Sequence, residues 1–496
     1  MNGRWSSPVR KFVSLKAENQ FTFLNVTREV SFPADWNNPL FEKLWLYNLH
    51  YFDYINPEKA HSCTSASSKI ISQWIKDNPP GLGNGWEPYP LSLRIVNWIK
   101  WELSCNSLDD LGVHSLAIQV RFLEQKLEWH LLGNHLFANA KALIFAGLFF
   151  DGREADRWFS RGKRILEKQL PEQVLVDGGN FELTPMYHEI FLEDLLDLSN
   201  IARAYQCDEL DNLQSVVSKM NYWLKAMTHP DGQISFFNDA AKKIAPEPNE
   251  LFAYSKSLGV EPLEIGKGLI ALEDSGYIRV ENEAAVVLID CARVGPDYIP
   301  GHAHADTLSF ECSLFGERLI VNSGTSCYGI SLERERQRST PAHSTVTINN
   351  ESSSEVWGGF RVARRAYPRD LSVRVEADEF YIKCSHDGYK RLKGRPIHTR
   401  EVKVDNMSIE VTDKISGDFD NAIGRLYFSP EVEVRLEGDN YGRLVFDDRV
   451  VDWKLLGGEI SLKDSTYHPE FGKSVPNKCI EYKIIERKSQ FKIGWT

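Results

Sequence analysis

The hydrophobic period of this chain changes once along its length, and this change constrains the fold more than any other feature. Between Trp36 and about Ile270 the apolar residues recur at steps of three and four, which is typical of amphipathic helices. From Gly276 onward they alternate with polar residues, which is typical of strands with one buried face. Helices followed by strands, without β-α-β alternation, predict two separate kinds of layer rather than a parallel sheet. The clearest helical stripes occupy residues 86–103, 113–129, 136–149, 155–170 and 190–205, and the clearest strands lie near residues 308–314, 346–348, 371–375, 407–411 and 432–436.

The same change predicts how the 496 residues divide into domains. A chain of this length is about three times a typical domain, so two or three domains are expected. Residues 1–35 are predicted to form an irregular, strand-containing lead-in, and residues 36–270 a domain of seven or more helices joined by short links. Residues 271–496 are predicted to form an antiparallel β-sandwich. The predicted fold class is therefore α+β with several domains.

Composition excludes several classes of function. The net charge of −11 argues against general nucleic-acid binding, because a surface that follows phosphates needs an excess of basic residues. No apolar run reaches the length of a membrane span, since LIFAGLFF at 143–150 is far too short. The first residues, MNGRWSSPVRKFVSLKAENQ, lack the apolar core of a secretion signal. We therefore expect a cytoplasmic protein, with a periplasmic location as the alternative if the N-terminus is mature or truncated.

The eight cysteines are scattered and form no CxxC pair. In a chain of this size, that pattern predicts reduced thiols rather than a disulfide framework.

The segment from Gly301 to Asn350 concentrates residues that could carry chemistry. It contains GHAHADTLSFE and AHSTVTINN, and it holds His302, His304 and His343. His302, His304 and Asp306 lie two residues apart, so an extended backbone would direct the three side chains to one side. The segment is therefore either a site or the solvated end of a strand.

Two polar clusters stand out in the helical half. Asn134 and His135 lie at the start of an apolar helix, where free backbone N–H groups and the helix dipole favour an anion. The alternative for Asn134 is a helix N-cap. Tyr187 lies near the entry of the helix at 190–205, and its alternative role is that of a half-buried packing residue.

The order of these motifs resembles that of the heparinase II/III-type polysaccharide lyases. GNH at 133–135 is followed by TPMYHEIFLEDLLDL, GHAHADTLSFE, the turn VNSGT and AHSTVTINN, and the resemblance runs from about Trp45 to Trp357. It implies an incomplete α/α toroid followed by an antiparallel β-sandwich. It also implies an acidic, uronate-containing glycan as substrate, cleaved by β-elimination in the cleft between these domains.

The resemblance implies a catalytic role for four residues. Asn134, with His135 beside it, is expected to hydrogen-bond the substrate carboxylate as negative charge develops there. Tyr187 and His302 are expected to divide the two proton transfers, one as the base at C5 and the other as the acid at the O4 leaving group. Which residue takes which role depends on the epimer at C5.

A phenol with an ordinary pKa near ~10 is a poor base, so we expect a neighbouring cation to lower the pKa of Tyr187. We further expect Arg338, Arg361 and His188 to contact the substrate. The candidate cations are Arg334, Arg336, Arg338, Arg361, Arg364 and Arg365.

Some relatives hold a structural zinc ion through a histidine, an aspartate and a histidine. The matching residues here are His304, Asn322 and His343, with an asparagine in place of the aspartate. Asparagine is a weak zinc ligand. The two histidines therefore either hold zinc or form hydrogen bonds that brace His302.

These observations predict a polysaccharide lyase without an organic cofactor. One rival is a glycoside hydrolase, because α/α toroids also host pairs of catalytic carboxylates, and Glu182, Glu189 and Asp239 are available. The other rival is a non-catalytic protein that binds glycans or assists their assembly. Fold alone does not decide among the three, and the sequence predicts no oligomeric state.

Overall fold

The computed structural model describes residues 3–57, 65–105 and 108–495. Contacts within the chain divide it into two compact units. Unit 1 comprises Met1–Val174, Ile190–Ser218 and Asn249–Pro262. Unit 2 comprises Leu175–Glu189, Lys219–Pro248 and Leu263–Thr496. The domain boundaries drawn at residues 35 and 270 stay a prediction.

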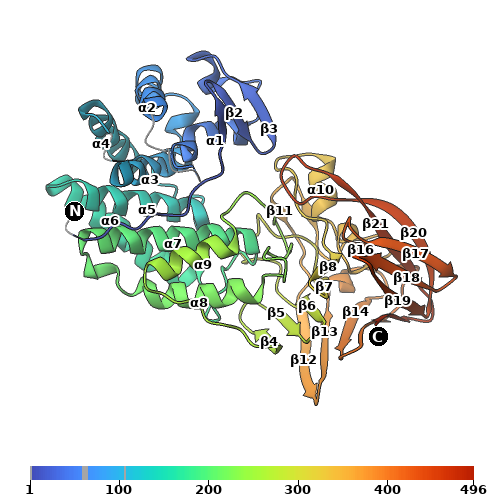
Figure 1. The fold of residues 1–496 in the computed structure, drawn as a ribbon. Helices are drawn as coiled ribbons and strands as arrows, with labels where there is room; N and C mark the ends of the chain where they lie inside the picture. Colours follow the sequence, from blue (N-terminus) through green and yellow to red (C-terminus); the bar gives the residue numbers. More distant parts are fainter. Residues whose placement is uncertain (1–2, 58–64, 106–107, 496) are drawn as a thin grey trace. The chain divides into compact units, whose positions relative to one another are not determined.

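Unit 1 is mainly helical (Figure 1). Its small lead-in sheet consists of β1 (Leu15–Ala17), β2 (Gln20–Phe23) and β3 (Val26–Glu29). The α-helices of the described chain are α1 (Lys43–Tyr51), α2 (Ser65–Asp77), α3 (Pro88–Cys105), α4 (Asp110–Glu124), α5 (Gly133–Phe149), α6 (Arg153–Gln173), α7 (Pro185–Tyr205), α8 (Leu213–Ala226), α9 (Pro248–Ser257) and α10 (Leu332–Arg338). The first turn of α7, the second half of α8 and all of α10 belong to unit 2.

Helix α5 forms the centre of unit 1. Every residue from Leu136 to Ala146 is buried, because α5 packs against α3 and α6. A link of residues 150–152 joins α5 to α6, and so short a connection makes the two helices antiparallel neighbours. Within the described residues, no helix is long and apolar enough to cross a membrane.

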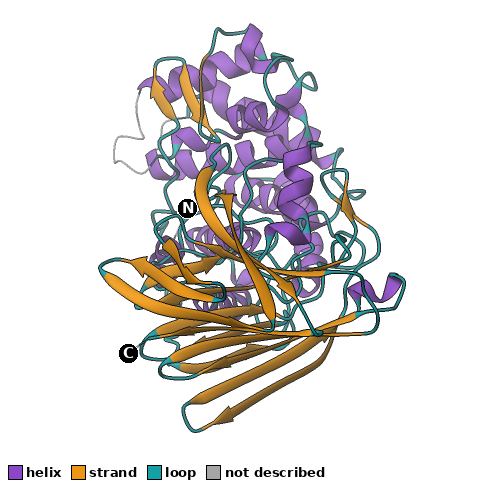
Figure 2. Ribbon diagram, turned by 90° about the vertical axis from the view of Figure 1, so that its right-hand side faces the viewer, coloured by secondary structure: helices purple, strands orange, loops and turns teal. Residues whose placement is uncertain are grey.

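Unit 2 contains two large antiparallel sheets, drawn as stacked orange layers in Figure 2. The nine-stranded sheet has the order β20 (Gly458–Tyr467), β21 (Val475–Ile484), β16 (Ala422–Phe428), β8 (Glu317–Val321), β7 (Phe310–Leu314), β6 (Ala285–Asp290), β5 (Tyr277–Glu281) and β4 (Gly268–Leu272), with β9 (Val346–Ile348) paired to β16. The eight-stranded sheet has the order β12 (Pro368–Glu376), β13 (Glu379–His386), β14 (Ile397–Val404), β15 (Ser408–Ser416), β22 (Lys488–Gly494), β19 (Arg449–Leu456), β18 (Tyr441–Phe446) and β17 (Glu433–Gly438).

The two sheets bury a shared core, which makes unit 2 a β-sandwich. Val287 of β6 and Val411 of β15 belong to one buried cluster, although they come from different sheets. Strand β6 is buried on both faces, because Val286 and Leu288 pack on the other side against Trp223 of α8. This double burial explains why β6 reads as a continuous apolar run rather than an alternating one.

The predicted order of helices and then strands is confirmed, with local corrections. Residues 228–247 lie in the stretch predicted to be helical, but they form turns and loops instead. Residues 301–309 were expected to be extended, whereas they form turns and loops before β7 begins at Phe310. Both loops carry site residues.

The cysteine prediction also needs a correction. Cys105 is disulfide-bonded, so the expectation of reduced thiols is wrong at this residue. Cys63 lies outside the described residues. The free thiols are those of Cys207, Cys291, Cys312, Cys327, Cys384 and Cys479.

Candidate active site

Tyr187 is held at the first turn of α7 by local sequence. Thr184 caps the helix, because its Oγ1 accepts a hydrogen bond from the Tyr187 backbone N–H at 3.0 Å, and Pro185 occupies the first helical position. The Tyr187 phenol lies 3.0 Å from the hydroxyl of Tyr328. Its ring stacks on the imidazole of His302, with ring centroids 3.9 Å apart.

His302 is oriented by a buried carboxylate. Its Nδ1 lies 2.9 Å from Oδ2 of Asp239. An ionised carboxylate only accepts hydrogen bonds, so Nδ1 must donate and the neutral ring carries its lone pair on Nε2. The Nε2 atom is 3.6 Å from Oε2 of Glu182, which is too long for a hydrogen bond. The His302 side chain is 17% exposed, so its ring remains accessible.

Asp239 is the centre of this network and is fully buried. Besides His302, it accepts hydrogen bonds from His304 Nε2 at 2.8 Å, from Thr325 Oγ1 at 3.3 Å and from both terminal nitrogens of Arg334. Burial opposes ionisation, but Arg334 and the two imidazoles outweigh it and hold the pKa of Asp239 well below its usual range. Asp239 is therefore a carboxylate that orients two histidines.

Arg334 ties this carboxylate to neighbouring aromatic rings. Its Nε donates to the Gly359 carbonyl oxygen at 3.0 Å. Its guanidinium carbon lies 5.0 Å from the ring centroid of Tyr328 and 5.3 Å from that of Phe360. We use the name Tyr187 cluster for Tyr187, His302, Tyr328, Asp239 and Arg334, all of which belong to unit 2.

The expectation of a lowered phenol pKa is wrong. Burial and then the adjacent Tyr328 raise the pKa of Tyr187 well above its usual range. Arg334, a candidate cation beside Tyr328, is paired with Asp239 through two hydrogen bonds. The raised pKa favours Tyr187 as a proton donor rather than as a base.

Two of the three predicted substrate contacts are in the interior, which corrects that assignment. His188 is fully buried, lies 3.0 Å from the Met220 carbonyl oxygen and stacks on Trp223. Arg338 is 1% exposed, and its Nε and Nη2 donate to the Ala303 carbonyl oxygen. Burial and then Arg334 lower the pKa of Arg338 to about 10. Both side chains are therefore buried and bound to backbone carbonyl groups, which favours a structural role for them.

Asn134 and His135 lie in unit 1, at the start of α5. The N-cap of α5 is Leu132, so the alternative role of Asn134 as the cap is excluded. Asn134 is partly exposed, and its side-chain amide has no hydrogen bond within the part of the chain that the structure describes. His135 Nδ1 lies 3.0 Å from Oε1 of Glu128, and its ring packs against Tyr89 with centroids 4.5 Å apart.

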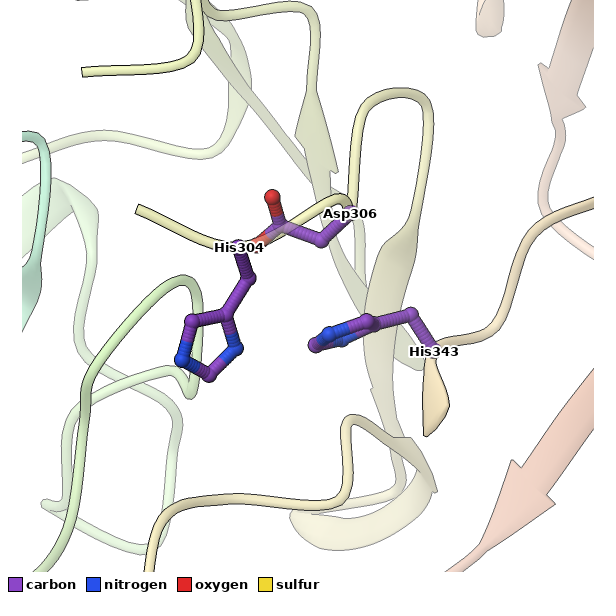
Figure 3. A group of neighbouring side chains, drawn as sticks. All are labelled: His304, Asp306 and His343. Atoms are coloured by element: carbon purple, nitrogen blue, oxygen red, sulfur yellow. The ribbon is translucent and has the colours of Figure 1, made fainter. Parts of the chain in front are cut away.

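A second group of histidines and an aspartate includes His304, which follows His302 by two residues. His304, Asp306 and His343 are buried, and one ligand atom from each lies within 4.8 Å of the others. Figure 3 shows the two imidazole rings side by side, with the Asp306 carboxylate next to them. Asp306 therefore adds a carboxylate to the predicted set of His304, His343 and Asn322. The spacing in the sequence indicates only that Asp306 and His302 point to the same side of an extended backbone.

The hydrogen bonds of this group leave two nitrogen lone pairs without a partner. His304 donates from Nε2 to Asp239, so its neutral ring carries the lone pair on Nδ1. Asn322 Oδ1 lies 3.3 Å from His343 Nδ1 and 3.4 Å from the backbone N–H of Ser344, so this oxygen accepts and the His343 lone pair is on Nε2. His304 Nδ1 and His343 Nε2 are both buried and lack hydrogen-bond partners among the described residues. Two free imidazole lone pairs and a carboxylate are a donor set that fits a metal ion.

The sequence pattern missed two residues of the Tyr187 cluster. Asp239 was considered only as a hydrolase carboxylate, although the polar pair Asn238–Asp239 interrupts the apolar run FFNDAA and could have drawn attention. Tyr328 carries no signal of its own, since it lies in a loop after VNSGT.

The family models and relatives agree with these observations. The model described as "Heparinase II/III N-terminus" matches residues 70–251, and "Heparinase II/III-like, C-terminal" matches residues 264–496. A heparin-sulfate lyase from Bacteroides stercoris is 27% identical over 335 residues, which are 61% of this chain and 46% of that protein. A second heparin-sulfate lyase, from Pedobacter heparinus, is 25% identical over 57% of this chain and 47% of that protein. The chain therefore spans about half the length of the curated relatives it matches.

Solved structures share the fold. A crystal structure of heparinase III has a TM-score of 0.74 at 17% identity and covers 90% of this chain and 76% of its own. The similarity confirms an α/α toroid followed by a β-sandwich. Because the two family models together match most of the sequence, this chain belongs to the heparinase II/III family.

Proposed function

We propose that this protein is a polysaccharide lyase that cleaves a uronate-containing acidic glycan by β-elimination. The observation that carries the proposal is the stacking of an accessible imidazole on a phenol, with the ring centroids of His302 and Tyr187 3.9 Å apart. His302 Nε2 has no hydrogen bond within the described residues, while burial raises the pKa of the stacked Tyr187 and favours its protonated form. Together they supply a proton acceptor and a proton donor within one site.

The geometry favours one division of the two roles. His302 accepts the C5 proton at Nε2, and Asp239 stabilises the imidazolium that forms, because its carboxylate binds Nδ1. Tyr187 donates its phenolic proton to the O4 leaving group. The electron pair of the C5–H bond then forms the C4=C5 double bond as the C4–O bond breaks.

We further propose that Asn134 and His135 bind the substrate carboxylate. Removing the C5 proton places extra negative charge on this carboxylate, so hydrogen-bond donors directed at it lower the barrier. The free amide of Asn134 and its position at the start of α5 support this role, since backbone N–H groups there also favour an anion.

The arrangement of the carboxylates argues against the glycoside hydrolase. A hydrolase needs two carboxyl groups that reach the glycosidic bond. Asp239 is fully buried, and both of its oxygens are bound to His302, His304 and Arg334. Glu182 and Glu189 are also buried, at 4% and 3% exposure.

We propose that zinc is the metal held by His304, His343 and Asp306. Two neutral imidazoles and a carboxylate suit this ion, and Asn322 orients His343 rather than serving as a ligand. When bound, zinc would link the loop at 301–309 to His343 and so stabilise the backbone that carries His302. The chemical steps belong to Tyr187 and His302.

The partner follows from the same proposal. Two relatives are named heparin-sulfate lyases, and a solved lyase with the same fold is described in complex with chondroitin sulphate. We propose a glycosaminoglycan of this class as the substrate. The disulfide at Cys105 supports the periplasmic alternative over the cytoplasm, because disulfides persist in oxidising compartments.

The test is a screen of glycans for new ultraviolet absorbance, which the conjugated C4=C5 product of elimination generates. Heparan sulfate, chondroitin sulfate and other uronate glycans form the panel, with a neutral glucan as the control substrate. We expect absorbance to rise with at least one uronate glycan, to vanish in Tyr187→Phe and to persist in Tyr441→Phe, which alters an exposed tyrosine. Cleavage without absorbance would reject the lyase.

A further inference from the structure

The β-hairpin of β10 (Val356–Trp357) and β11 (Arg361–Val362) presents a paired aromatic ring and cation to solvent. Trp357 and Arg361 are directly opposite each other in the hairpin. The guanidinium carbon of Arg361 lies 5.0 Å from the centroid of the Trp357 ring, while the tryptophan is 50% exposed. Exposed tryptophans of this kind are costly in water and are typical of binding surfaces.

The hairpin is held rigidly against the Tyr187 cluster. Its turn residue Gly359 accepts the hydrogen bond from Arg334 Nε. A Cβ atom at Gly359 would lie 2.5 Å from the Gly329 carbonyl oxygen, and its φ of +78° also requires glycine. The adjacent Phe360 ring lies 5.9 Å from His302 and 5.2 Å from Tyr328. Phe360, which precedes Arg361 in the chain, therefore links this hairpin to the ring of His302.

Arg361 differs from the other arginines that the sequence singled out. Arg364 pairs with Glu355, and Arg365 pairs with Asp297. Arg361 is exposed and has no carboxylate partner within the described parts of the chain. In a protein with a net charge of −11, an unpaired arginine stacked on an exposed tryptophan is complementary to an anion.

We infer that Trp357 and Arg361 form a subsite for one anionic sugar of the glycan, next to the sugar on which His302 acts. The indole offers an apolar surface to a sugar ring, and the guanidinium binds the carboxylate or sulfate of that sugar through two parallel N–H groups. Stacking on Trp357 restricts the arginine before the ligand arrives, so less freedom is lost on binding. This inference rests on the proposed function for the identity of the sugar.

The experiment compares Trp357→Ala, Arg361→Gln and a matched control. Arg374→Gln makes the same change at an exposed arginine that also stacks on an aromatic ring, Tyr381, at 4.6 Å. Arg374 differs because it pairs with Glu376 and lies on β12 of the eight-stranded sheet. The steady-state assay uses the glycan that the wild type cleaves, and circular dichroism checks that each variant is folded.

We expect KM to rise about tenfold or more in Trp357→Ala and Arg361→Gln, with kcat within about twofold of the wild type. Arg374→Gln should match the wild type. Desulfated substrate shows whether Arg361 binds a sulfate or a carboxylate group. If it binds sulfate, Arg361→Gln and the wild type should have the same KM on desulfated substrate. If it binds carboxylate, the KM of Arg361→Gln should still be higher than that of the wild type. Unchanged KM in both variants, or an equal loss in Arg374→Gln, would overturn the subsite.

A binding assay separates this inference from the proposed function. Titration calorimetry with a heparan sulfate oligosaccharide needs no turnover. If the wild type cleaves no glycan but its binding weakens about tenfold or more in Trp357→Ala and Arg361→Gln, the lyase is wrong and the subsite stands. If the wild type cleaves the glycan and neither variant changes KM or affinity, the subsite is wrong and the lyase stands.

Discussion

Replacing Asp239 by asparagine tests the network that orients His302. The amide is nearly isosteric with the carboxylate, but it keeps a single acceptor oxygen and removes the charge. If the amide nitrogen takes the Oδ2 position, it faces the donating His302 Nδ1 and Arg334 Nη2. In the opposite rotamer it faces His304 Nε2, Thr325 Oγ1 and Arg334 Nη1. In either case at least two donors lose their acceptor.

The expected loss of stability follows from these contacts. Hydrogen bonds to a charged group contribute about 1.5–3 kcal/mol each, and removing one partner of a buried ion pair costs about 3–5 kcal/mol. We therefore expect Asp239→Asn to lower the free energy of unfolding by about 3–5 kcal/mol. Thr325→Val removes one hydrogen bond to the same carboxylate, but at 3.3 Å this bond is long for O–H···O, so the loss should lie below that range, at about 0.5–1.5 kcal/mol. Asp448→Asn alters an exposed aspartate and serves as the control.

Urea denaturation measures the three free energies, and the glycan assay measures kcat. In one rotamer His302 loses the acceptor that fixes its tautomer, and in both it loses the negative charge that stabilises its imidazolium, so kcat of Asp239→Asn should fall by about 10²–10⁴, the usual contribution of a general base. A loss of stability below about 1 kcal/mol, or kcat equal to that of Asp448→Asn, would show that Asp239 does not organise the site.

Three further predictions concern other parts of the site. Tyr187→Phe should lower kcat by orders of magnitude while leaving Tm nearly unchanged, because among the described residues the hydroxyl makes one hydrogen bond, to Tyr328. Near-normal turnover would remove Tyr187 from the mechanism. Removal of zinc with a chelator, checked by elemental analysis, should lower Tm before activity is lost. In His343→Ala the chelator should leave Tm unchanged. If protein isolated without chelator contains no stoichiometric zinc, the proposed metal is rejected. Asn134→Ala should lower kcat by about 10²–10³ on a substrate with a free uronate, and much less on its methyl ester, whose carboxyl group is already neutral. Equal losses on both substrates would show that Asn134 only positions the substrate and does not neutralise its carboxylate.

The hydrophobic periodicity of the sequence was sufficient to predict the order of helices and strands. Burial of one face places apolar residues at steps of three and four in a helix and at every second residue in a strand. It could not show that residues 228–247 leave the helical pattern, since FFNDAA is apolar enough for either structure. The motifs located Tyr187 and His302, whose rings the structure stacks 3.9 Å apart. Their roles, and that of Asn134, stay predictions.

The contacts of Asp239 show why the rest of the site could not be predicted. It is 63 residues from His302 and 95 residues from Arg334 in sequence, so no local pattern connects them. The sequence also does not reveal which polar side chains are buried. His188 and Arg338 lie in or near the motifs of the predicted site, but both are buried and bound to backbone carbonyl groups. The spacing of His302, His304 and Asp306 predicts a shared direction of their side chains. The position of Asp306 beside His343 depends on the loop at residues 301–309, which the hydrophobic period does not predict.

Mass spectrometry of products formed in water labelled with oxygen-18 tests the central claim most directly. β-Elimination breaks the C4–O bond without adding water, so we predict fragments without oxygen-18 whose masses add up to that of the substrate, one of them with an unsaturated uronate at its end. A glycoside hydrolase adds one water at each cleavage. Fragments that carry oxygen-18 at the new reducing end would contradict the proposed reaction.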